Sequence, residues 1–214
     1  KTNIEVTDLK DTMNLYSERY ERPGCYWGKT PSNSCYRVLQ MLPPERSLRL
    51  LDIGCGEGRN AIFFARNGYQ VTAFDTSAAG VEKTRQLAAE AGVTIDAFVA
   101  DINEFRLTES YDVLFSTGVL QYVPPEQRKD LFLNYRNFTS PGGLNVFSVF
   151  VKKPFIEKAP DAEKAAFKWI SGELFTYYHD WKIEYCNEDI FDCMSSGVQH
   201  QHAVNRIIAR KEGK

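Results

Sequence analysis

The sequence predicts an α/β, doubly wound fold with a mostly parallel seven-stranded sheet, an N-terminal helical cap and an antiparallel C-terminal hairpin. Between residues 48 and 150, short apolar segments alternate with segments of helical period. The apolar segments run without polar alternation, which is typical of parallel strands buried on both faces. After residue 150 this alternation of strand-like and helical segments ends, and two further strand-like segments follow a polar insert. These observations predict one domain over 1–214, with a cap at 1–45, a core at 49–150, and an insert and final strands at 151–214.

The first 45 residues are polar and aromatic, and they predict two helices. The apolar period predicts the first helix over residues 6–20, with one face formed by Leu9, Met13, Tyr16 and Tyr20. A turn-rich segment, YWGKTPS, separates it from the second helix. We expect Ser32 or Ser34 to cap that second helix, and a proline pair ends it after Met41.

The central segment carries five expected strands and three expected helices. The strands are expected at residues 48–54, 69–75, 94–101, 111–117 and 142–150. The helices are expected at residues 58–68, 77–92 and 124–138. Glycines close the first two helices, Ser77 caps the second, and a proline opens the third. Because the connections are short, the order of elements predicts a parallel sheet with crossover helices.

The last third of the chain departs from this order. Residues 152–170 have balanced charge and few apolar side chains, which favours a solvated surface insert over a lid or a partner helix. A short helix is expected within 171–178. Two strands are expected at 181–189 and 202–211, and we expect them to form a hairpin at the edge of the sheet.

The composition excludes several classes of protein. The chain has 214 residues, 43% of them hydrophobic and 25% charged, and a net charge of -2, which gives no basic footprint for nucleic acid. No apolar run approaches the roughly 18 residues of a membrane span, and the first residues lack the pattern of a signal peptide. Five cysteines without a CxxC pair argue against a disulfide framework. We therefore expect a cytoplasmic monomer or weak homodimer with a small-molecule substrate, and no nucleic-acid or membrane partner.

The segment LDIGCGEGRN carries the strongest functional signal. Asp52 closes an expected buried strand, and a helix begins just after the loop. The loop contains three evenly spaced glycines: Gly54, Gly56 and Gly58. Glycines allow a ligand to approach the backbone, and the helix N-terminus presents free N–H groups to an anion. A dinucleotide-binding loop would have the spacing G-x-G-x-x-G, but its third glycine is replaced here by Arg59. We interpret Cys55 as a small packed residue rather than a nucleophile.

Two more acidic residues lie at the ends of expected strands. Asp75 ends the second strand, where its carboxylate can accept hydrogen bonds from both hydroxyls of a ribose. Asp101 ends the third strand, where an adenine amino group would lie. Three acidic strand ends beside a glycine loop therefore indicate a site for a nucleoside-containing cofactor.

Together these segments resemble those of class I S-adenosylmethionine-dependent methyltransferases over roughly residues 49–150. LDIGCGEGRN is similar to the family's glycine loop, VTAFDTS to its ribose strand, VADINEF to its adenine strand, and YDVLFSTGVLQYVPPEQR to the region after its fourth strand. The resemblance implies a Rossmann-like sheet that binds S-adenosylmethionine and releases S-adenosylhomocysteine. It implies that the loop holds the methionine end and that Thr117 approaches the reactive end. The expected cofactor-binding residues are Tyr20, Trp27, Asp52, Gly54, Cys55, Gly56, Gly58, Arg59, Asn60, Asp75, Thr76, Asp101, Ile102 and Thr117.

A narrower resemblance is to the small tellurite-resistance type of methyltransferase. That group has a GCGxGRN loop, a GELxxYYxDWxI segment before the last strands and a following NED. The matching segments here are GCGEGRN, GELFTYYHDWKI and residues 187–189. The final segment NRIIARK is also similar to the last strand of that group. The segment CYWGKTPS instead resembles the opening segments of thiopurine and thiol methyltransferases, and the SSGVQHQHAV turn differs from that of the tellurite group. These departures leave the acceptor open.

The segment SSGVQHQHAV places His200 and His202 two residues apart, so both rings face one side of a strand. Three interpretations stay open. The pair could bind a metal with Cys193 or Asp192 as the third ligand, serve an active site by positioning an anion or taking a proton, or be solvated. We favour the active-site pair with Arg206 on the same face, and we expect no metal.

The expected function is methyl transfer from S-adenosylmethionine to a small acceptor, most simply a thiol or a chalcogen oxyanion. A thiolate or oxyanion already carries a lone pair and needs little base assistance, whereas an amine or hydroxyl acceptor would need a base such as histidine. An aromatic lid would favour the sulfonium cation, with Tyr16, Tyr20, Trp27 and Tyr122 as candidates. The expected catalytic residues are Tyr122, His200, His202 and Arg206. The alternatives are N- or O-methylation of a metabolite, a nicotinamide-dependent oxidoreductase and a non-catalytic cofactor-binding regulator.

Overall fold

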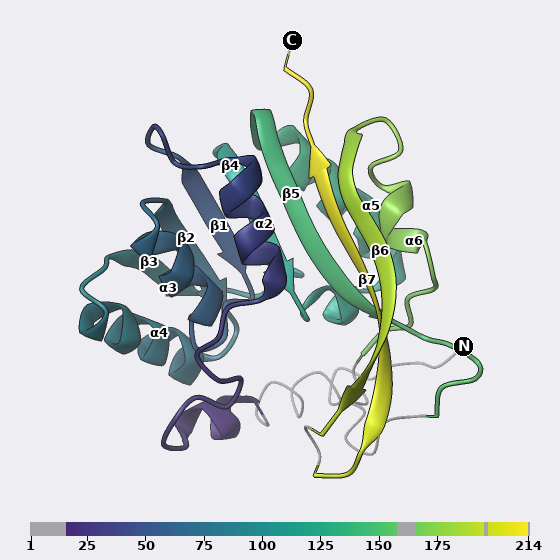
Figure 1. Cartoon of the computed structure of the whole chain (residues 1–214), viewed down its shortest axis with the longest axis horizontal. Helices are drawn as coiled ribbons and strands as arrows, with labels where there is room; N and C mark the ends of the chain where they lie inside the picture. The colour runs from purple at the N-terminus through teal and green to yellow at the C-terminus, as the bar shows by residue number, and fades with distance from the viewer. Residues whose placement is uncertain (1–15, 158–165, 195–196, 214) are drawn as a thin grey trace.

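The computed structural model describes residues 16–157, 166–194 and 197–213 (Figure 1). Their strands form a single mixed sheet in the order β3-β2-β1-β4-β5-β7-β6. The strands are β1 Arg49–Ile53, β2 Gln70–Asp75, β3 Ile95–Val99, β4 Tyr111–Thr117, β5 Thr139–Val151, β6 Lys182–Cys193 and β7 His200–Arg210. β1 to β5 pair in parallel, whereas β7 is antiparallel to both β5 and β6. The predicted mostly parallel sheet with a C-terminal hairpin is confirmed.

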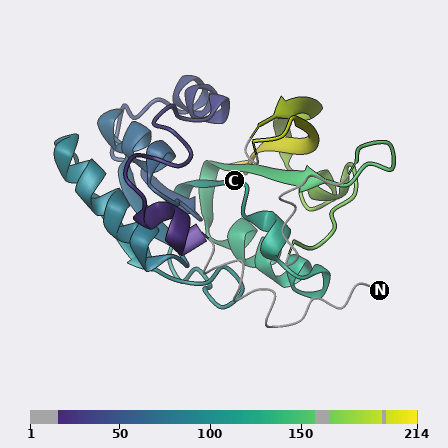
Figure 2. The same ribbon diagram turned by 90° about the horizontal axis from the view of Figure 1, so that it is seen from below.

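Helices cover both faces of this sheet. They are α2 Asn33–Met41, α3 Arg59–Arg66, α4 Ala78–Glu90, α5 Pro125–Asn137 and α6 Glu173–Thr176, with a 3-10 turn, η1, at Leu120–Tyr122. Buried side chains of α2, α3 and α4 share one hydrophobic core, and those of α5 and α6 share the other. Figure 2 shows α2 and α5 on opposite sides of β5. The fold is therefore doubly wound, as the sequence predicts.

Local sequence explains where these elements begin and end. The strand β4 is buried along all but its last residue, as expected for an uninterrupted apolar segment in the middle of a sheet. The Ser77 hydroxyl accepts a hydrogen bond from the Gly80 N–H (3.1 Å), so it caps α4 as predicted. Gly68 and Gly92 follow α3 and α4 with positive φ, which ends both helices.

The order of the strands creates the crevice in which a ligand can bind. The chain runs outward from β1 through β2 to β3, then returns to place β4 on the other side of β1. The connections after β1 and β4 therefore diverge at the carboxyl ends of these two strands. In open α/β sheets ligands bind at such a switch point.

Near the ends of the chain, the bounds of the hairpin strands differ from the sequence predictions. Residues 16–21 are helical, whereas the remainder of the helix predicted over 6–20 lies outside the described residues. The hairpin strands are longer than predicted: β6 continues to Cys193 and β7 begins at His200. In the described residues no helix is long and apolar enough to cross a membrane.

The prediction of a solvated insert over 152–170 is wrong at its C-terminal end. Trp169 is fully buried, and its indole N–H donates to the Leu120 carbonyl (3.0 Å). The guanidinium of the buried Arg128 lies 3.8 Å from the centre of the Trp169 ring. Arg128 also pairs with Glu173 (2.5 Å), so its charge is compensated inside the protein. Tertiary packing on α5 thus buries a tryptophan at the end of a charged segment of the sequence.

Candidate active site

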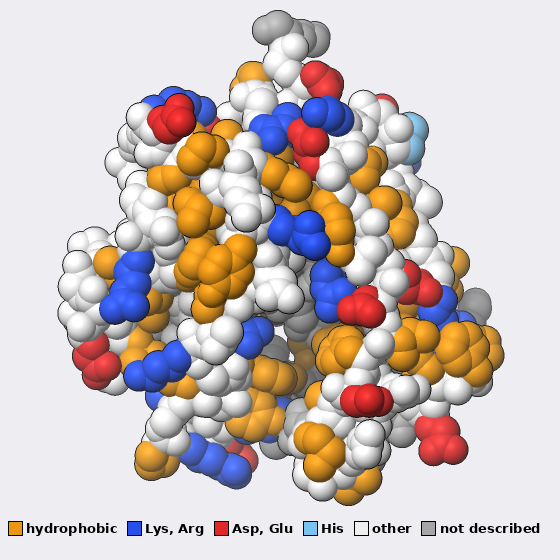
Figure 3. All heavy atoms as spheres, viewed as in Figure 1, with side chains coloured by type: hydrophobic (Ala, Val, Ile, Leu, Met, Phe, Trp, Pro, Cys, Tyr) orange, Lys and Arg blue, Asp and Glu red, His pale blue; other side chains and the backbone are white. Residues whose placement is uncertain are grey.

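A cavity of about 480 Å³ lies at the switch point between β1 and β4, within the range of roughly 300–1,000 Å³ for small-molecule sites. One wall consists of the glycine loop, the ends of β2 and β4 and the residues after β3; the other consists of β5, β6 and β7. Figure 3 shows the molecule hollowed between these two parts. The cavity therefore joins the expected cofactor site to the C-terminal hairpin.

The glycine loop is held tightly by the surrounding protein. The backbone N–H groups of Gly54 and Cys55 both donate to the Phe74 carbonyl, at 2.8 and 2.9 Å. Gly54 has φ 72°, and a Cβ on it would lie 2.1 Å from Val119 Cγ2. Only glycine fits this position. Gly54, Cys55 and Gly56 line the cavity, whereas Gly58 lies outside its lining.

Asp75 ties the loop to the end of β2. Its carboxylate accepts hydrogen bonds from the N–H of Gly56 (2.8 Å) and of Ser77 (2.9 Å). Burial raises the pKa of Asp75, and these N–H donors act in the opposite direction. Asp75 and Thr76, which are predicted to bind the cofactor, both line the cavity. A carboxylate has about four lone-pair positions, so Asp75 retains capacity for ribose hydroxyls.

Asp52 lies behind the loop rather than in the cavity lining. Its side chain is 1% exposed, and among the described residues Oδ2 has no hydrogen-bond partner. Burial raises the pKa of Asp52 to about 7, against the lowering effect of the Arg59 guanidinium. Asp52, the penultimate residue of β1, is therefore a buried acid outside the lining of the cavity.

The residues after β3 form a pocket with free acceptors. Asp101 and Ile102, which are predicted to bind the adenine, line the cavity beside Asn103 and Gln121. Within residues 16–157, 166–194 and 197–213, the side-chain oxygens of Asn103 and Gln121 are buried and accept no hydrogen bond. An adenine amino group is a donor that suits such acceptors, and Phe74 supplies an apolar surface in the same cavity. The lining residues thus fit the adenosyl part of S-adenosylmethionine.

Four aromatic side chains cover the cavity from the N-terminal segment and η1. Tyr16, Tyr20, Trp27 and Tyr122 all line it, as the predicted aromatic lid requires. The Trp27 indole N–H donates to the Tyr20 hydroxyl (3.1 Å), and the Tyr16 ring centre lies 6.2 Å from that of Trp27. The Tyr122 hydroxyl donates to the Tyr16 hydroxyl (3.5 Å), which joins the two segments.

Glu57, inside the glycine loop, anchors this N-terminal segment. Its carboxylate accepts the Trp27 backbone N–H (3.3 Å) and pairs with Lys83 (2.9 Å). Lys83 in turn donates to the Tyr20 carbonyl (2.7 Å). The Arg59 guanidinium donates to the Trp27 carbonyl (3.0 Å). The sequence analysis missed Glu57 because its partners lie 26 and 30 residues away in the chain.

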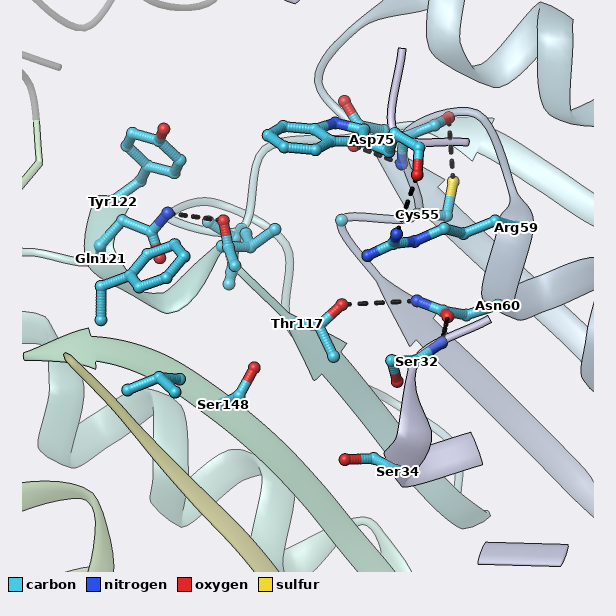
Figure 4. Close-up of a pocket in the computed structure, with 18 of the residues that line it drawn as sticks. Ser32, Ser34, Cys55, Arg59, Asn60, Asp75, Thr117, Gln121, Tyr122 and Ser148 are labelled. Atoms are coloured by element: carbon cyan, nitrogen blue, oxygen red, sulfur yellow. Dashed lines mark hydrogen bonds between the residues drawn. The ribbon is translucent and has the colours of Figure 1, made fainter. Parts of the chain in front are cut away.

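Asn60 links three elements at the bottom of the cavity. Its amide nitrogen donates to Thr117 Oγ1 (3.4 Å), and its amide oxygen accepts the Ser32 N–H (3.0 Å) (Figure 4). The start of α2, the start of α3 and the end of β4 are thereby held together. Figure 4 also shows Ser148 and Tyr122 on the opposite side of the cavity from Asn60.

The Cys55 thiol is unsuited to act as a nucleophile. It is 7% exposed and lies 3.9 Å from the Thr84 hydroxyl. Burial raises its pKa well above the ordinary value, and the neighbouring carboxyls of Asp75 and Asp52 act in the same direction. Since the thiolate is the reactive form, this cysteine is a packing residue, as the sequence analysis interprets it.

The hairpin wall is polar and carries two guanidinium groups. Arg206 lines it and pairs with Asp189 (3.3 Å). Arg37 of α2 reaches the same wall and lies 4.0 Å from the centre of the Tyr185 ring. Asn187 stands opposite Arg206 in the ladder, and its buried amide oxygen has no hydrogen-bond partner among the described residues.

Of this wall, the sequence analysis found only Arg206. Arg37 and Tyr185 are far apart in the chain, and only the register of the folded sheet brings them together. The sequence signal that could have found the wall is the alternation of side chains between the two faces of β6. Every second residue lines the cavity: Tyr185, Asn187, Asp189 and Phe191.

His200 and His202 lie next to the cavity but not in its lining. They continue the face of β7 that carries Val204 and Arg206. The His202 ring centre lies 4.9 Å from that of Phe150, which does line the cavity. His200 Nε2 and His202 Nε2 are 3.0 Å apart, so the prediction that both rings face one side is confirmed.

Known proteins of similar sequence include methyltransferases. The family model of the tellurite resistance protein TehB matches residues 26–209. The chain is 28% identical over 185 residues to a probable S-adenosyl-L-methionine-dependent methyltransferase TehB of Haemophilus influenzae, a match that covers 86% of this chain and 62% of that protein. It is 32% identical over 157 residues to hemagglutinin 1 of Eikenella corrodens, covering 73% of this chain and 50% of that one. The chain thus spans less than two thirds of the length of these curated relatives.

Solved structures share the fold. The crystal structure of TehB from Haemophilus influenzae superposes with a TM-score of 0.75 at 22% identity, covering 94% of this chain and 67% of that one. A SAM-dependent methyltransferase from Methanosarcina mazei superposes with a TM-score of 0.65 at 19% identity, covering 86% and 100% of the respective chains. Since the family model matches most of the chain, the protein belongs to the family of the tellurite resistance protein TehB.

Proposed function

We propose that this protein transfers a methyl group from S-adenosylmethionine to a small anionic acceptor, a thiolate or a chalcogen oxyanion, and releases S-adenosylhomocysteine. The observation that carries the proposal is the two-walled cavity. One wall offers the glycine loop, Asp75 and the acceptor atoms near Asp101, and the facing wall offers Arg206 and Arg37. The first wall suits an adenosyl cofactor, and the second suits a small anion.

The cofactor supplies a sulfonium methyl group that a nucleophile can displace in line. The task of the protein is to hold the two reactants at the correct distance and to exclude water. The glycine loop and Asp75 fix one end of the cavity through hydrogen bonds to the backbone. The aromatic cap formed by Tyr16, Tyr20, Trp27 and Tyr122 covers it, and ring faces attract a cation.

The hairpin wall would position the acceptor. Its two guanidinium groups, from Arg37 and Arg206, are opposed by one carboxylate, that of Asp189, which leaves the wall with excess positive charge. Guanidinium groups bind oxyanions with two parallel hydrogen bonds, and they favour the ionised form of a nearby thiol. A thiolate or oxyanion bound there needs no general base. The catalytic role predicted for His200 and His202 stays a prediction, because neither ring lines the cavity.

An acceptor panel tests this proposal. Purified protein with S-adenosylmethionine is offered small thiols, selenite, tellurite and primary amines, and S-adenosylhomocysteine release is measured. We expect turnover with at least one thiol or chalcogen oxyanion and none above background with the amines. Turnover with amines alone would contradict the anionic acceptor.

A further inference from the structure

A second group of chemically active side chains lies at the tip of the β6–β7 hairpin, beyond the cavity. Cys193, His200 and His202 are half-buried there, and one ligand atom from each lies within 4.8 Å of the others. Cys193 and His200 are directly opposite each other in the ladder, and Phe191 is opposite His202. The last residue of β6 and the first residues of β7 thus bring a thiol and two imidazoles together.

A backbone contact sets the orientation of one imidazole. His200 Nδ1 lies 2.7 Å from the Val198 carbonyl oxygen. A carbonyl can only accept a hydrogen bond, so Nδ1 carries the proton and the lone pair of the neutral ring is on Nε2. Nε2 is the atom that faces His202. A backbone carbonyl on one ring nitrogen fixes the orientation of the imidazole, as it does in most metal-binding histidines, and here it turns Nε2 toward the second imidazole.

The distances suit one small ion. His200 Nε2 and His202 Nε2 are 3.0 Å apart. Two nitrogens bound tetrahedrally to zinc at about 2.0–2.1 Å would lie about 3.3 Å apart. The separation of the two nitrogens would therefore change by only a few tenths of an ångström when an ion binds between them. The Cys193 sulfur lies within 4.8 Å of both nitrogens.

From this cluster we propose a binding site for one divalent ion of the zinc class, with Cys193 Sγ, His200 Nε2 and His202 Nε2 as ligands. One thiolate and two imidazoles are borderline-soft ligands, which select zinc over magnesium or calcium. Three protein ligands leave a fourth position for water or an exogenous anion, as in zinc sites that stay open. The site replaces the metal-free interpretation of these histidines and does not depend on methyl transfer.

Calorimetric titration of the full chain with zinc chloride tests the site, after chelator treatment and removal of the chelator under a phosphine reductant. We expect one ion per chain with a micromolar or lower Kd. Cys193→Ser and His202→Ala should each weaken binding at least tenfold. Cys186→Ser and His179→Ala are the matched controls, because Cys186 lies on the other face of β6 and His179 lies outside the hairpin. Both controls should bind zinc as the parent chain does.

A second measurement identifies the ligands directly. Cobalt chloride should give a thiolate-to-cobalt charge-transfer band that Cys193→Ser loses and Cys186→Ser keeps. S-adenosylhomocysteine affinity should agree within twofold in all four variants, which shows that each is folded. If the parent chain binds no zinc, or if the control variants lose as much affinity as the site variants, the site does not exist and the histidines form only a hydrogen-bonded pair.

Discussion

At the residue scale, Asp52 is a buried carboxyl group outside the lining of the cavity. It is the penultimate residue of β1, is 1% exposed and lies two residues before the first glycine of the loop. Burial raises its pKa to about 7, although Arg59 acts to lower it. An acid whose folded pKa exceeds its unfolded value binds more protons in the folded state. Its contribution therefore makes the folded protein less stable as pH rises from about 4 to about 7.

Asp52→Asn should remove this pH dependence. Between pH 5 and pH 8, the parent chain should lose about 2–3 kcal/mol of unfolding free energy from this group, whereas the amide variant loses none of it. Urea denaturation of both proteins at the two pH values measures the difference. An equal change in unfolding free energy in the two proteins would show that Asp52 is ionised at pH 5 in the folded state.

The loop glycines show what could be predicted at this scale. A glycine trio after an acidic strand end indicates close backbone approach, and Gly54 indeed has no room for a Cβ beside Val119. The sequence could not show that the obstacle is a side chain of the protein itself. The role of Glu57 could not be predicted from the sequence for the same reason, because its partners Lys83 and Trp27 come from other parts of the chain.

At the element scale, the segment before α2 covers the wall of the cavity that contains the glycine loop. Tyr20, Trp27 and the loop residue Glu57 form one hydrogen-bonded unit with Lys83. The Trp27 side chain is 41% exposed and lines the cavity, so its ring can serve as a face for a cation. This arrangement predicts that the cap distinguishes a sulfonium from a neutral thioether.

Trp27→Ala should weaken the binding of S-adenosylmethionine more than the binding of S-adenosylhomocysteine. Loss of a cation–π contact costs about 0.5–2 kcal/mol, which is roughly a twofold to thirtyfold difference between the two ligands. Calorimetric titration of both ligands measures it, with Tyr36→Ala, an exposed aromatic residue on α2, as the control. An equal loss for both ligands would assign Trp27 to packing alone.

In the proposed function the hairpin supplies the acceptor wall, and Arg206 is the residue of that wall that is most readily tested. Ser148 of β5 and Asn187 of β6 flank Arg206 in the sheet. Arg206→Gln should raise the KM for an anionic acceptor at least about tenfold, or about 1.4 kcal/mol, because a charge-assisted contact is lost. The Kd of S-adenosylhomocysteine should change less than twofold. Arg66→Gln, an exposed arginine in the last turn of α3, should leave both constants unchanged. An unchanged KM in Arg206→Gln would remove Arg206 from the acceptor site.

At the scale of the whole molecule, the sequence predicts the cofactor half of the protein better than the acceptor half. The parallel core depends on local signals, namely apolar strands, caps such as Ser77 and glycines after helices, and these appear where expected. The acceptor wall depends on register between distant segments, so Arg37 and Tyr185 could not be paired in advance. Trp169 was misassigned because Arg128, a residue of α5, buries it.

The central claim is that the cavity at the switch point holds an adenosyl sulfonium cofactor and not a dinucleotide. Calorimetric titration of the purified chain with S-adenosylhomocysteine and, separately, with NAD tests it most directly. The structure predicts one S-adenosylhomocysteine per chain with a Kd on the order of micromolar, and no heat of binding with NAD. Binding of NAD with no binding of S-adenosylhomocysteine would contradict the account.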